Sequence, residues 1–560
     1  MRWRFIFLLF FFGGLYALLI FKIYNLQLKN GDYYSERAEA QQRAGGELES
    51  IRGNIYFTDK NNNLIPAVLN KEYPEIYAVP KEIQGNNNNK EYAERLSPII
   101  NISVEELDKK FRKPNDLYEL LVQKAEPEQV NRIKELNLKG IYIKNQLLRF
   151  YPAGNLASHV LGFIGPMADK DELAGRYGIE LYFNDLLAGK SGQAKGDTLI
   201  KPEDGKNLVL TIDRSIQAQA EETLNNLIKK YSAIGGTVIV QEPATGKILA
   251  MGSFPNFDPN NYSASEIGDF LNPAVQSVYE PGSVFKLFTM AAGIDSGKIT
   301  PETTYYDSGL VTFNGRTIQN WDLKAYGTRT MTEVIENSIN TGAVFAERKT
   351  GHDIFYNYLI KFKLNEFTGI DLPGEVKGSI ENLKNGRDIN FATASFGQGV
   401  SVTPIELINT MSAIANGGVL MKPYILADGS PKTIQRIISV ETSKAVAKMM
   451  VSAVKKNVIA DIPNYSVAGK TGTAFVPDFE KGGYTDDVIN TYIGFAPALI
   501  NQGEARPDSS GRPASAPKFI ILIKIDKPAG APLAGMTVVP AFRELAQFIL
   551  NYYNIAPDEL

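Results

Sequence analysis

The sequence predicts an α+β fold that follows one apolar N-terminal helix. Strand patterns occur on both sides of a long, mostly helical stretch, 283–416, which is the order expected when an antiparallel sheet joins distant segments. No internal repeat interrupts that order. A chain of 560 residues is long enough for several domains. We expect three parts, 1–28, 29–204 and 205–560.

The composition excludes several kinds of chemistry. The chain has no cysteine, which excludes disulfides, thiolate nucleophiles, Cys-ligated zinc and iron–sulfur clusters. Its two histidines, His159 and His352, exclude a multi-histidine metal site and leave few bases for a Ser-His-Asp mechanism. A net charge of −3 gives no electrostatic footprint for nucleic acid. We therefore expect no cofactor, no metal and no nucleic-acid partner, and a chemistry that uses mainly carboxylate, hydroxyl, amide or lysine groups.

Residues 1–28 are predicted to form a cytoplasmic N-terminus and a transmembrane anchor. The stretch Phe5–Phe21 carries no charge, and as a helix it would reach about 25 Å, close to the ~30 Å of a hydrocarbon core. Arg2 and Arg4 precede it, which places the N-terminus in the cytoplasm and the rest of the chain outside. A cleaved signal peptide is the alternative, but no small-residue cleavage site follows Phe21. We expect a single-pass protein of the cytoplasmic membrane.

Residues 29–204 are predicted to form an elongated, non-catalytic pedestal module. The segment is charged and irregular, with helical patterns near 104–111 and 128–136 and strand patterns at 75–79 and 140–143. We expect a moderately packed, extended module.

Residues 205–560 have a finer alternation of helix and strand patterns and are predicted to form one α+β domain. We expect a strand at 208–212, a helix at 214–230, a hairpin of 236–241 with 247–251, strands at 466–469, 491–495 and 518–525, and a closing helix at 540–553.

Ser283 and Lys286 form the first candidate catalytic pair. The serine follows a Pro-Gly turn in the segment EPGSVFK (280–286), at the start of a helical pattern, and residues three apart share one helix face. The free N–H groups and positive dipole of a helix N-terminus stabilise an oxyanion and disfavour an ammonium group. A lysine whose pKa is lowered in this way can act as the general base for a serine.

Neither S-x-x-K nor K-[ST]-G is specific by itself. S-x-x-K recurs at Ser452 and Ser515, and K-[ST]-G recurs at 190–192 and 349–351. Local context separates these matches, which lie in a helix interior, in loops or at a helix end. Lys470-Thr471-Gly472-Thr473 instead continues an extended segment, in which glycine allows close approach by a substrate.

Ser338 and Asn340 form the third element, an S-x-N tripeptide. Taken alone, it would be a polar turn after a helix. Because Ser283, Ser338 and Lys470 occur in this order with long intervals, a helical subdomain could carry Ser338 and Asn340 to one side of a cleft. The Lys470 strand would form the other side.

The three motifs in this order resemble the signatures of the penicillin-binding protein and serine β-lactamase superfamily. Further stretches resemble one branch of it, the class B penicillin-binding proteins, which are monofunctional peptidoglycan transpeptidases. These stretches are Arg52–Ile55, Ala157–Gly162, Gly178–Glu180, Gly397–Gly399 and Gly494–Pro497. The resemblance covers nearly all of the chain beyond the anchor, and it implies an antiparallel sheet flanked by helices, with an all-α subdomain.

The sequence departs from the family pattern at a few places. Asn62 stands in an early turn where glycine is expected, and Val284 and Ile339 are apolar where the family has mostly Thr, Ser or another small residue. The segment 501–517 is interpreted as an inserted surface loop.

The resemblance implies a role for each residue that matches a signature. Ser283 would attack the carbonyl of the penultimate D-alanine of a stem peptide and release the terminal D-alanine. Lys286 would take the hydroxyl proton, and Asn340 would orient this lysine and contact the substrate amide. Ser338 and Lys470 could carry a proton to the departing amine.

The resemblance also implies how substrate is held. Thr471, Gly472 and Thr473 would bind it, with the two hydroxyls near its terminal carboxylate. Backbone N–H groups of Ser283 and Thr473 would form the oxyanion hole. β-Lactams would acylate the same serine.

Several alternatives remain open from the sequence. A β-lactamase or a D,D-carboxypeptidase would share the three motifs, a β-lactam-sensing receptor would acylate without turnover, and a non-catalytic scaffold would need none of them. Among class B enzymes, the anchor, the short first module and the stretch 285–292 favour the division-type septal enzyme over the elongation type. Either type implies a membrane-embedded glycan polymerase and proteins of a division or elongation complex as partners.

Overall fold

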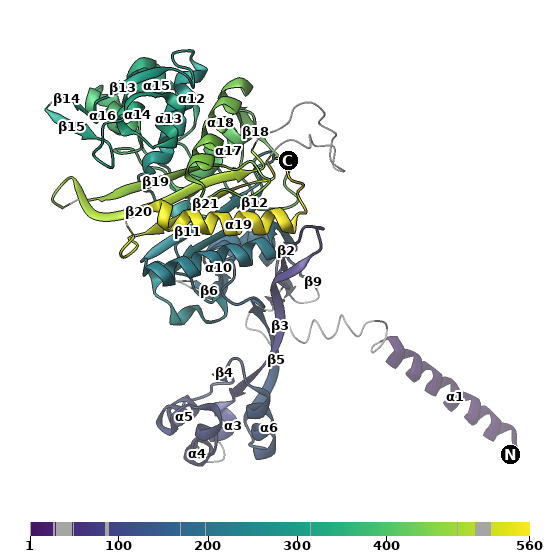
Figure 1. Ribbon diagram of the computed structural model, residues 1–560. Coiled ribbons are helices and arrows are strands. Elements are labelled where there is room, and N and C mark those ends of the chain that lie inside the picture. Colours follow the sequence, from purple (N-terminus) through teal and green to yellow (C-terminus); the bar gives the residue numbers. More distant parts are fainter. Residues whose placement is uncertain are drawn as a thin grey trace. The chain divides into compact units, whose positions relative to one another are not determined.

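The chain forms two compact units, which are shown in the computed structural model of Figure 1. One unit is Val68–Pro152, and the other combines Met1–Ala67 with Ala153–Leu560. The structure describes residues 2–25, 29, 47–48, 50–84, 89–167, 170–195, 198–313, 315–478, 480–498, 517–531 and 533–559. The predicted insertion at 501–517 lies, except for its last residue, outside the described residues.

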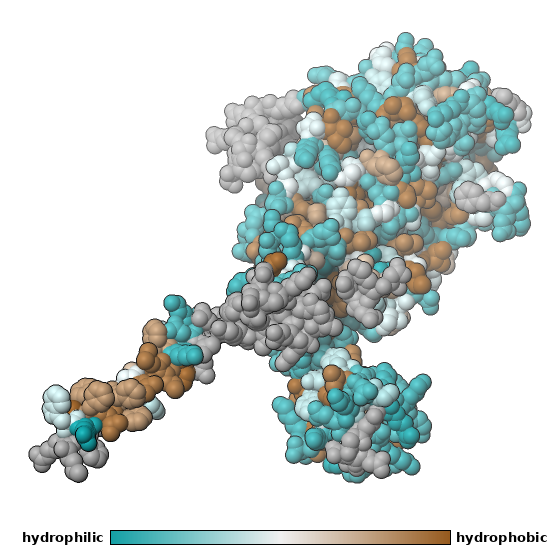
Figure 2. Space-filling model, turned by 180° about the vertical axis from the view of Figure 1, so that it is seen from behind, coloured by the Kyte–Doolittle hydropathy of each residue, from teal (hydrophilic) through white to brown (hydrophobic). Residues whose placement is uncertain are grey.

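Helix α1 (Arg2–Tyr24) is apolar along almost all of its length. Its segment Ile6–Tyr24 has a mean hydropathy of 2.3, and none of it is buried in the protein. Figure 2 shows hydrophobic side chains along the displayed face of this helix. The predicted N-terminal helix is therefore confirmed, and it is long and apolar enough to cross a membrane.

The unit Val68–Pro152 is a small antiparallel sheet with helices. Strand β3 (Ile65–Ala78) pairs with β4 (Glu119–Val122) and β5 (Ile141–Phe150). Apolar side chains of the strands and helices form one core, which includes Ile76, Leu96 and Phe111. The predicted helices and strands of this region are confirmed. Its helices are α3 (Pro80–Gln84), α4 (Asn89–Ile100), α5 (Val104–Phe111) and α6 (Pro127–Leu136).

The early turn forms although glycine is missing from it. Strand β2 (Ile55–Thr58) runs parallel to β10 (Leu208–Asp213) and leads into this turn. Asn62 adopts the left-handed φ of 60°, a conformation that asparagine tolerates better than most residues. The carboxylate of Asp59 accepts hydrogen bonds from the backbone N–H groups of Asn61 and Asn63.

A buried ion pair lies just before β2 in the sequence. Arg52 donates through Nε to Glu180 Oε2 at 2.7 Å and through Nη2 to the Glu180 carbonyl at 2.9 Å. The Glu180 side chain is fully buried on α8 (Gly178–Tyr182), and that of Arg52 is 13% exposed. Two of the motif stretches named above are thus joined to each other.

The centre of the larger unit is a five-stranded antiparallel sheet in the order β12-β11-β21-β20-β19. Helices α10 and α19 cover one face, and the helical block lies on the other (Figure 1). The predicted strands and both helices are confirmed. Their bounds are α10 (Arg214–Tyr231), β11 (Gly235–Gln241), β12 (Ile248–Phe254), β19 (Ala468–Pro477), β20 (Tyr484–Ala496), β21 (Phe519–Asp526) and α19 (Val538–Tyr552).

The stretch 283–416 contains the expected helices, but the prediction missed two hairpins. Strand β13 (Thr304–Asp307) pairs with β16 (Gly327–Thr330), and β14 (Leu310–Phe313) pairs with β15 (Arg316–Gln319). Threonine, tyrosine and valine favour these strands. The helices are α12 (Lys286–Asp295), α13 (Met331–Glu336), α14 (Asn340–Thr350), α15 (His352–Lys361), α16 (Asp388–Ala394) and α17 (Pro404–Ala415), and α18 (Val440–Asn457) follows them.

Short elements complete the described chain. They are β1 (Glu47–Leu48), α7 (Ser158–Leu161), β6 (Ile164–Met167), β7 (Lys170–Gly175), α9 (Asn184–Ala188), β8 (Gly192–Lys195), β9 (Thr198–Ile200), η2 (Pro259–Ala264), η3 (Ile267–Phe270), α11 (Pro273–Gln276), η4 (Gly282–Phe285), η5 (Glu381–Asn385), β17 (Val419–Met421), β18 (Thr433–Arg436) and η6 (Ala534–Met536).

Candidate active site

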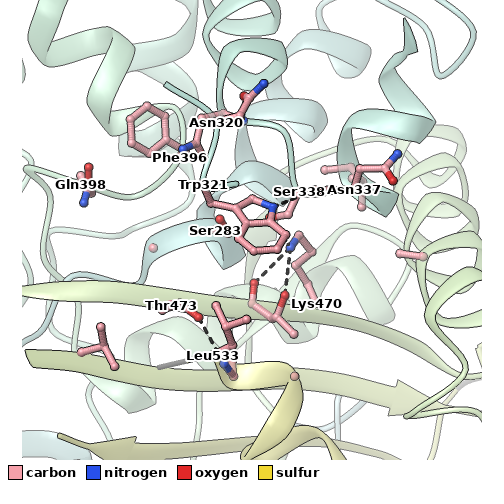
Figure 3. A pocket seen from close by; sticks show the side chains of 18 of the residues that line it. Ser283, Asn320, Trp321, Asn337, Ser338, Phe396, Gln398, Lys470, Thr473 and Leu533 are labelled. Atoms are coloured by element: carbon pink, nitrogen blue, oxygen red, sulfur yellow. Dashed lines mark hydrogen bonds between the residues drawn. The ribbon is translucent and has the colours of Figure 1, made fainter. Parts of the chain in front are cut away.

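A cleft of about 910 Å³ runs along the edge strand β19, between the sheet and the helical block. Its walls include Ser283, Ser338, Asn340, Lys470 and Thr473. Figure 3 shows Ser283, Ser338 and Lys470 around one part of this space. The structure therefore brings residues from three distant segments together, as the order of the motifs predicted.

Ser283 lies in η4 (Gly282–Phe285), a single turn of 3₁₀ helix that leads directly into α12. The turn is held by close backbone packing. Gly282 has a φ of +57°, and a Cβ atom there would lie 2.8 Å from the Thr473 carbonyl oxygen. Its N–H donates to the Gly397 carbonyl at 3.2 Å. Glu280 accepts a hydrogen bond from the Gly399 N–H at 2.9 Å, so the loop 397–399 fixes the position of the serine.

Lys286 is fully buried on the first turn of α12 and contacts neutral oxygen atoms. Its Nζ lies within hydrogen-bond distance of three oxygen atoms, at 2.5 Å from Ser338 O, 2.8 Å from Asn340 Oδ1 and 3.2 Å from Ser338 Oγ. Burial, together with the nearby Lys470, holds the pKa of Lys286 well below its ordinary value. The uncharged amine is the form that can accept a proton.

Lys470 is buried on β19, on the opposite side of Ser338. Its Nζ donates to Ser338 Oγ at 2.9 Å and to the Thr471 carbonyl at 3.1 Å. Burial lowers the pKa of Lys470 to about 7. The Ser338 hydroxyl thus lies between two buried lysines, and within the described chain neither of them has an ion pair with a carboxylate.

Ser338 and Asn340 are held by a network that the sequence did not reveal. Ser338 lies between α13 and α14 with a left-handed φ of 55°. Asn320 Oδ1 accepts hydrogen bonds from the N–H groups of Asn340 and Thr341, which begin α14. Asn320 in turn donates to buried Asp307 at 2.9 Å. An amide from a separate loop therefore caps this helix, a long-range contact that spacing along the chain does not indicate.

The three predicted substrate-binding residues, Thr471, Gly472 and Thr473, are consecutive on β19. Thr471 and Thr473 line the cleft, and Thr473 Oγ1 accepts a hydrogen bond from the Ala534 N–H at 3.3 Å. A Cβ at Gly472 would lie 2.5 Å from the Pro281 carbonyl oxygen. The sequence suggested that glycine here allows a substrate to come close to the strand. In the structure, it is the turn carrying Ser283 that comes close to β19 at Gly472.

Other residues line the cleft without a strong sequence signal. Trp321 is 57% exposed at its wall, and its indole N–H donates to the Asn337 carbonyl at 3.3 Å. Gln398 and Phe396 also lie there (Figure 3). In the described part of the chain, no group of three or more His, Asp or Glu side chains could hold a metal ion.

An antiparallel sheet with a lysine on its edge strand, facing a serine and a second lysine from a helical block, defines the fold class of penicillin-binding transpeptidases and serine β-lactamases. The comparisons with known proteins agree. The family model "Penicillin-binding Protein dimerisation domain" matches residues 47–226, and "Penicillin binding protein transpeptidase domain" matches residues 236–503. The chain belongs to the class B penicillin-binding proteins, a family of transpeptidases.

Curated relatives and a solved structure are similar over most of their length. Stage V sporulation protein D of Bacillus subtilis is 31% identical, over 96% of this chain and 83% of the relative. The peptidoglycan D,D-transpeptidase FtsI of Escherichia coli is 27% identical, over 97% of this chain and 91% of the relative. The crystal structure of penicillin-binding protein 2X from Streptococcus thermophilus superposes with a TM-score of 0.72 at 22% identity, over 91% of this chain and 81% of that chain.

Proposed function

We propose that this peptidoglycan D,D-transpeptidase cross-links stem peptides through an acyl-enzyme on Ser283. One observation carries the proposal: the Ser338 hydroxyl lies between two buried lysines, Lys286 and Lys470, whose pKa values burial lowers. Such lysines can exchange protons near neutral pH, which is what a serine nucleophile needs in a chain with two histidines.

In the first half of the reaction, Lys286 takes the proton of the Ser283 hydroxyl as the oxygen attacks the penultimate D-alanine carbonyl. Asn340 holds Lys286 through its Oδ1 atom. The peptide C–N bond then breaks, and Ser338 and Lys470 pass a proton to the nitrogen of the departing D-alanine. Backbone N–H groups of Ser283 and Thr473 stabilise the oxyanion, where a single donor is typically worth about 10²- to 10³-fold in rate.

In the second half, the amino group of a neighbouring stem peptide attacks the ester carbonyl and releases the serine. The donor's terminal carboxylate first lies against the hydroxyls of Thr471 and Thr473, with Gly472 keeping β19 close to the Ser283 turn. A β-lactam enters the same cleft and acylates Ser283 without efficient release.

We place the enzyme in septal cell-wall synthesis, with α1 as a single membrane anchor and residues 205–560 as an extracytoplasmic catalytic domain. Residues 29–204 form the pedestal. A membrane-embedded glycan polymerase of the division complex is the expected partner, contacted through the anchor and the pedestal. Lateral-wall elongation is the second candidate. A tagged copy should localise to midcell, and localisation along the side wall would favour elongation.

Labelling with a fluorescent penicillin tests the chemistry. The full chain should form a long-lived covalent adduct that a Ser283→Ala variant does not form. No adduct with the wild-type chain, or equal labelling of the variant, would contradict the proposal. Rapid hydrolysis of the adduct would indicate a β-lactamase, and hydrolysis of a D-Ala-D-Ala peptide without transfer to an added amine would indicate a carboxypeptidase.

A further inference from the structure

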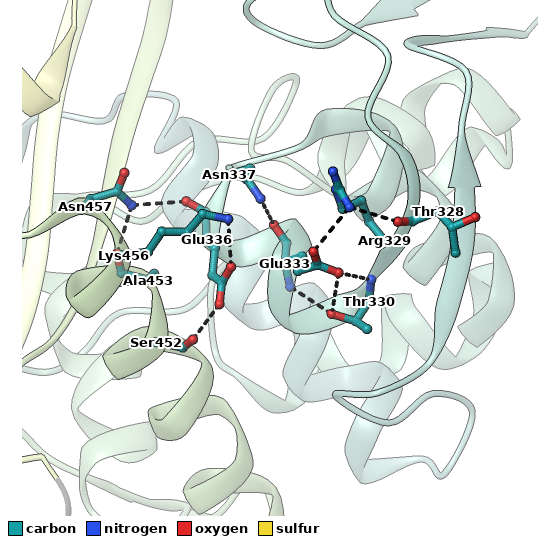
Figure 4. Close-up of polar contacts among 10 residues, drawn as sticks. All are labelled: Thr328, Arg329, Thr330, Glu333, Glu336, Asn337, Ser452, Ala453, Lys456 and Asn457. Carbon is teal, nitrogen blue, oxygen red and sulfur yellow. Dashed lines mark hydrogen bonds and ion pairs between the residues drawn. The ribbon is translucent and has the colours of Figure 1, made fainter.

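The end of helix α13, two residues before Ser338, is attached to the neighbouring helix α18. Glu336 is the last residue of α13 and lines the cleft. Ser452 Oγ donates to its Oε1 at 2.5 Å, Lys456 Nζ lies 3.0 Å from its Oε2, and Asn457 Nδ2 donates to its carbonyl at 3.2 Å (Figure 4). All three partners belong to α18, so one helix holds both carboxylate oxygens and the carbonyl.

These contacts connect the two segments whose side chains meet in the site. Helix α13 leads to Ser338, and α18 precedes β19, which carries Lys470. The two segments meet where Lys470 Nζ donates to Ser338 Oγ at 2.9 Å. Ser338 has a left-handed φ of 55°, which is strained for a non-glycine residue and persists only where neighbouring structure fixes it. Glu336 supplies such a fixed point on the N-terminal side of the turn.

The other acidic residue of α13 differs from Glu336 in what it contacts. Glu333 forms a capping box with Thr330, accepting from its N–H at 2.9 Å, and lies 3.4 Å from Arg329. These partners are within four residues, at the start of the same helix. Glu333 therefore stabilises α13 itself, whereas Glu336 fixes α13 against α18. The two glutamates form a matched pair for mutation (Figure 4).

We propose that Glu336 is a positioning residue for transpeptidation, which holds Ser338 against Lys470 by tying α13 to α18. This inference rests on the proposed function. The Lys456 side chain is 44% exposed, so its ion pair with Glu336 contributes little to folding. The position of Ser338 matters far more to the reaction, because a displacement of about 1 Å can lower a rate about 100-fold.

The test measures how fast the full chain is acylated by a fluorescent penicillin, as a function of pH, together with the unfolding temperature. We expect Glu336→Ala to slow acylation about 10- to 100-fold with little change in unfolding temperature. Its pH profile should move to higher pH, because water that enters the loosened site relaxes the burial that lowers the pKa of the base, Lys286. Glu336→Gln keeps an acceptor for Ser452 and should recover part of the rate. The control Glu333→Gln should behave like the wild type.

If Glu336→Ala has the acylation rate and the pH profile of the wild type, the inference is wrong. An equal loss of acylation rate in Glu333→Gln would also contradict it. If Glu336→Ala does not fold, Ser452→Ala carries the test, because alanine is the best helix former and the change removes one hydrogen bond to the carboxylate. We expect it to slow acylation about tenfold, and an unchanged rate would contradict the inference. Failure of the proposed function would look different, since the wild-type chain itself would then take no label.

Discussion

The molecule buries positive groups in two ways. At the Arg52 site, a guanidinium group that is 13% exposed lies 2.6 Å from a fully buried carboxylate, that of Glu180. In the cleft, Lys286 and Lys470 are buried as deeply, but their hydrogen-bond partners are hydroxyl, amide and carbonyl oxygens. In the first arrangement, Arg52 keeps its positive charge, and the Glu180 carboxylate neutralises it. In the second, burial lowers the pKa values of the two lysines.

The difference shows how the chain separates stability from chemistry. Arginine keeps its proton and binds a carboxylate through a fixed fork, which suits a structural joint. Lysine loses its proton when it is buried without a counter-charge, which suits a base or a proton carrier. Variants at the first site should therefore lose stability, and variants at the second should lose rate without losing stability.

The largest expected effect is on the rate, in Lys286→Met. Without the base, acylation by penicillin should fall about 10²- to 10⁴-fold. The free energy of unfolding should not fall, because an apolar chain of similar length replaces an amine whose burial lowers its pKa and therefore costs stability. Stopped-flow labelling and denaturant unfolding measure the two quantities. Acylation within tenfold of wild type would break the comparison.

The next effect is on stability, in Arg52→Met. It leaves Glu180 buried without its principal partner, which should cost about 3–5 kcal/mol of unfolding free energy. The acylation rate per folded molecule should not change, because Arg52 does not line the cleft. Denaturant unfolding and active-site titration check both parts. A stable Arg52→Met protein with slow acylation would reverse the roles that we assign to the two sites.

A smaller effect of the same kind is expected for Arg52→Lys. The variant keeps the charge but loses the fork that contacts the Glu180 carboxylate, the Glu180 carbonyl and Asn184. We expect a loss of about 1.5–3 kcal/mol, again without a change in acylation rate. Unfolding energies equal to those of wild type would show that charge alone holds this joint.

The smallest effect, per pH unit, is expected in the pH dependence of the unfolding free energy, which tests whether a buried lysine is uncharged. In the unfolded chain a lysine keeps its proton until about pH 10.4, whereas folded Lys470 loses it near 7. Between these values the unfolded state binds one more proton, so stability rises with pH. The difference between wild type and Lys470→Met should therefore change by about 1.4 kcal/mol per pH unit between pH 7.5 and 9.5. A difference that does not depend on pH would mean that folded Lys470 stays charged.

The sequence could place the candidate reacting groups at one site because they lie in short motifs whose residues keep a fixed spacing. Ser283, Ser338 and Lys470 could be placed on two sides of a cleft from their order alone, and the structure brings them together. The sheet and its two covering helices could be predicted because each has a clear period of apolar residues. The hairpins at 304–330 were missed, because short strands inside a helical stretch have little periodicity.

The supporting contacts could not be predicted, because they join segments far apart in the sequence. Asn320 caps α14 from another loop, and nothing in its local sequence marks it as a cap. Ser452 belongs to an S-x-x-K match on a helix that the sequence set aside, yet its hydroxyl holds Glu336. Motifs therefore pointed to the candidate reacting groups, whereas only the tertiary structure showed which residues hold them.

The central claim is that Lys286 acts as an uncharged base, because it is buried and, among the described residues, has no ion pair with a carboxylate. The most direct test is the pH dependence of the rate at which Ser283 is acylated by penicillin in the wild-type chain. The account predicts a rate that reaches its plateau well below the ordinary lysine value, since burial lowers the pKa of Lys286. A rate that keeps rising about tenfold per pH unit toward 10.5, the value of an ordinary lysine, would contradict it.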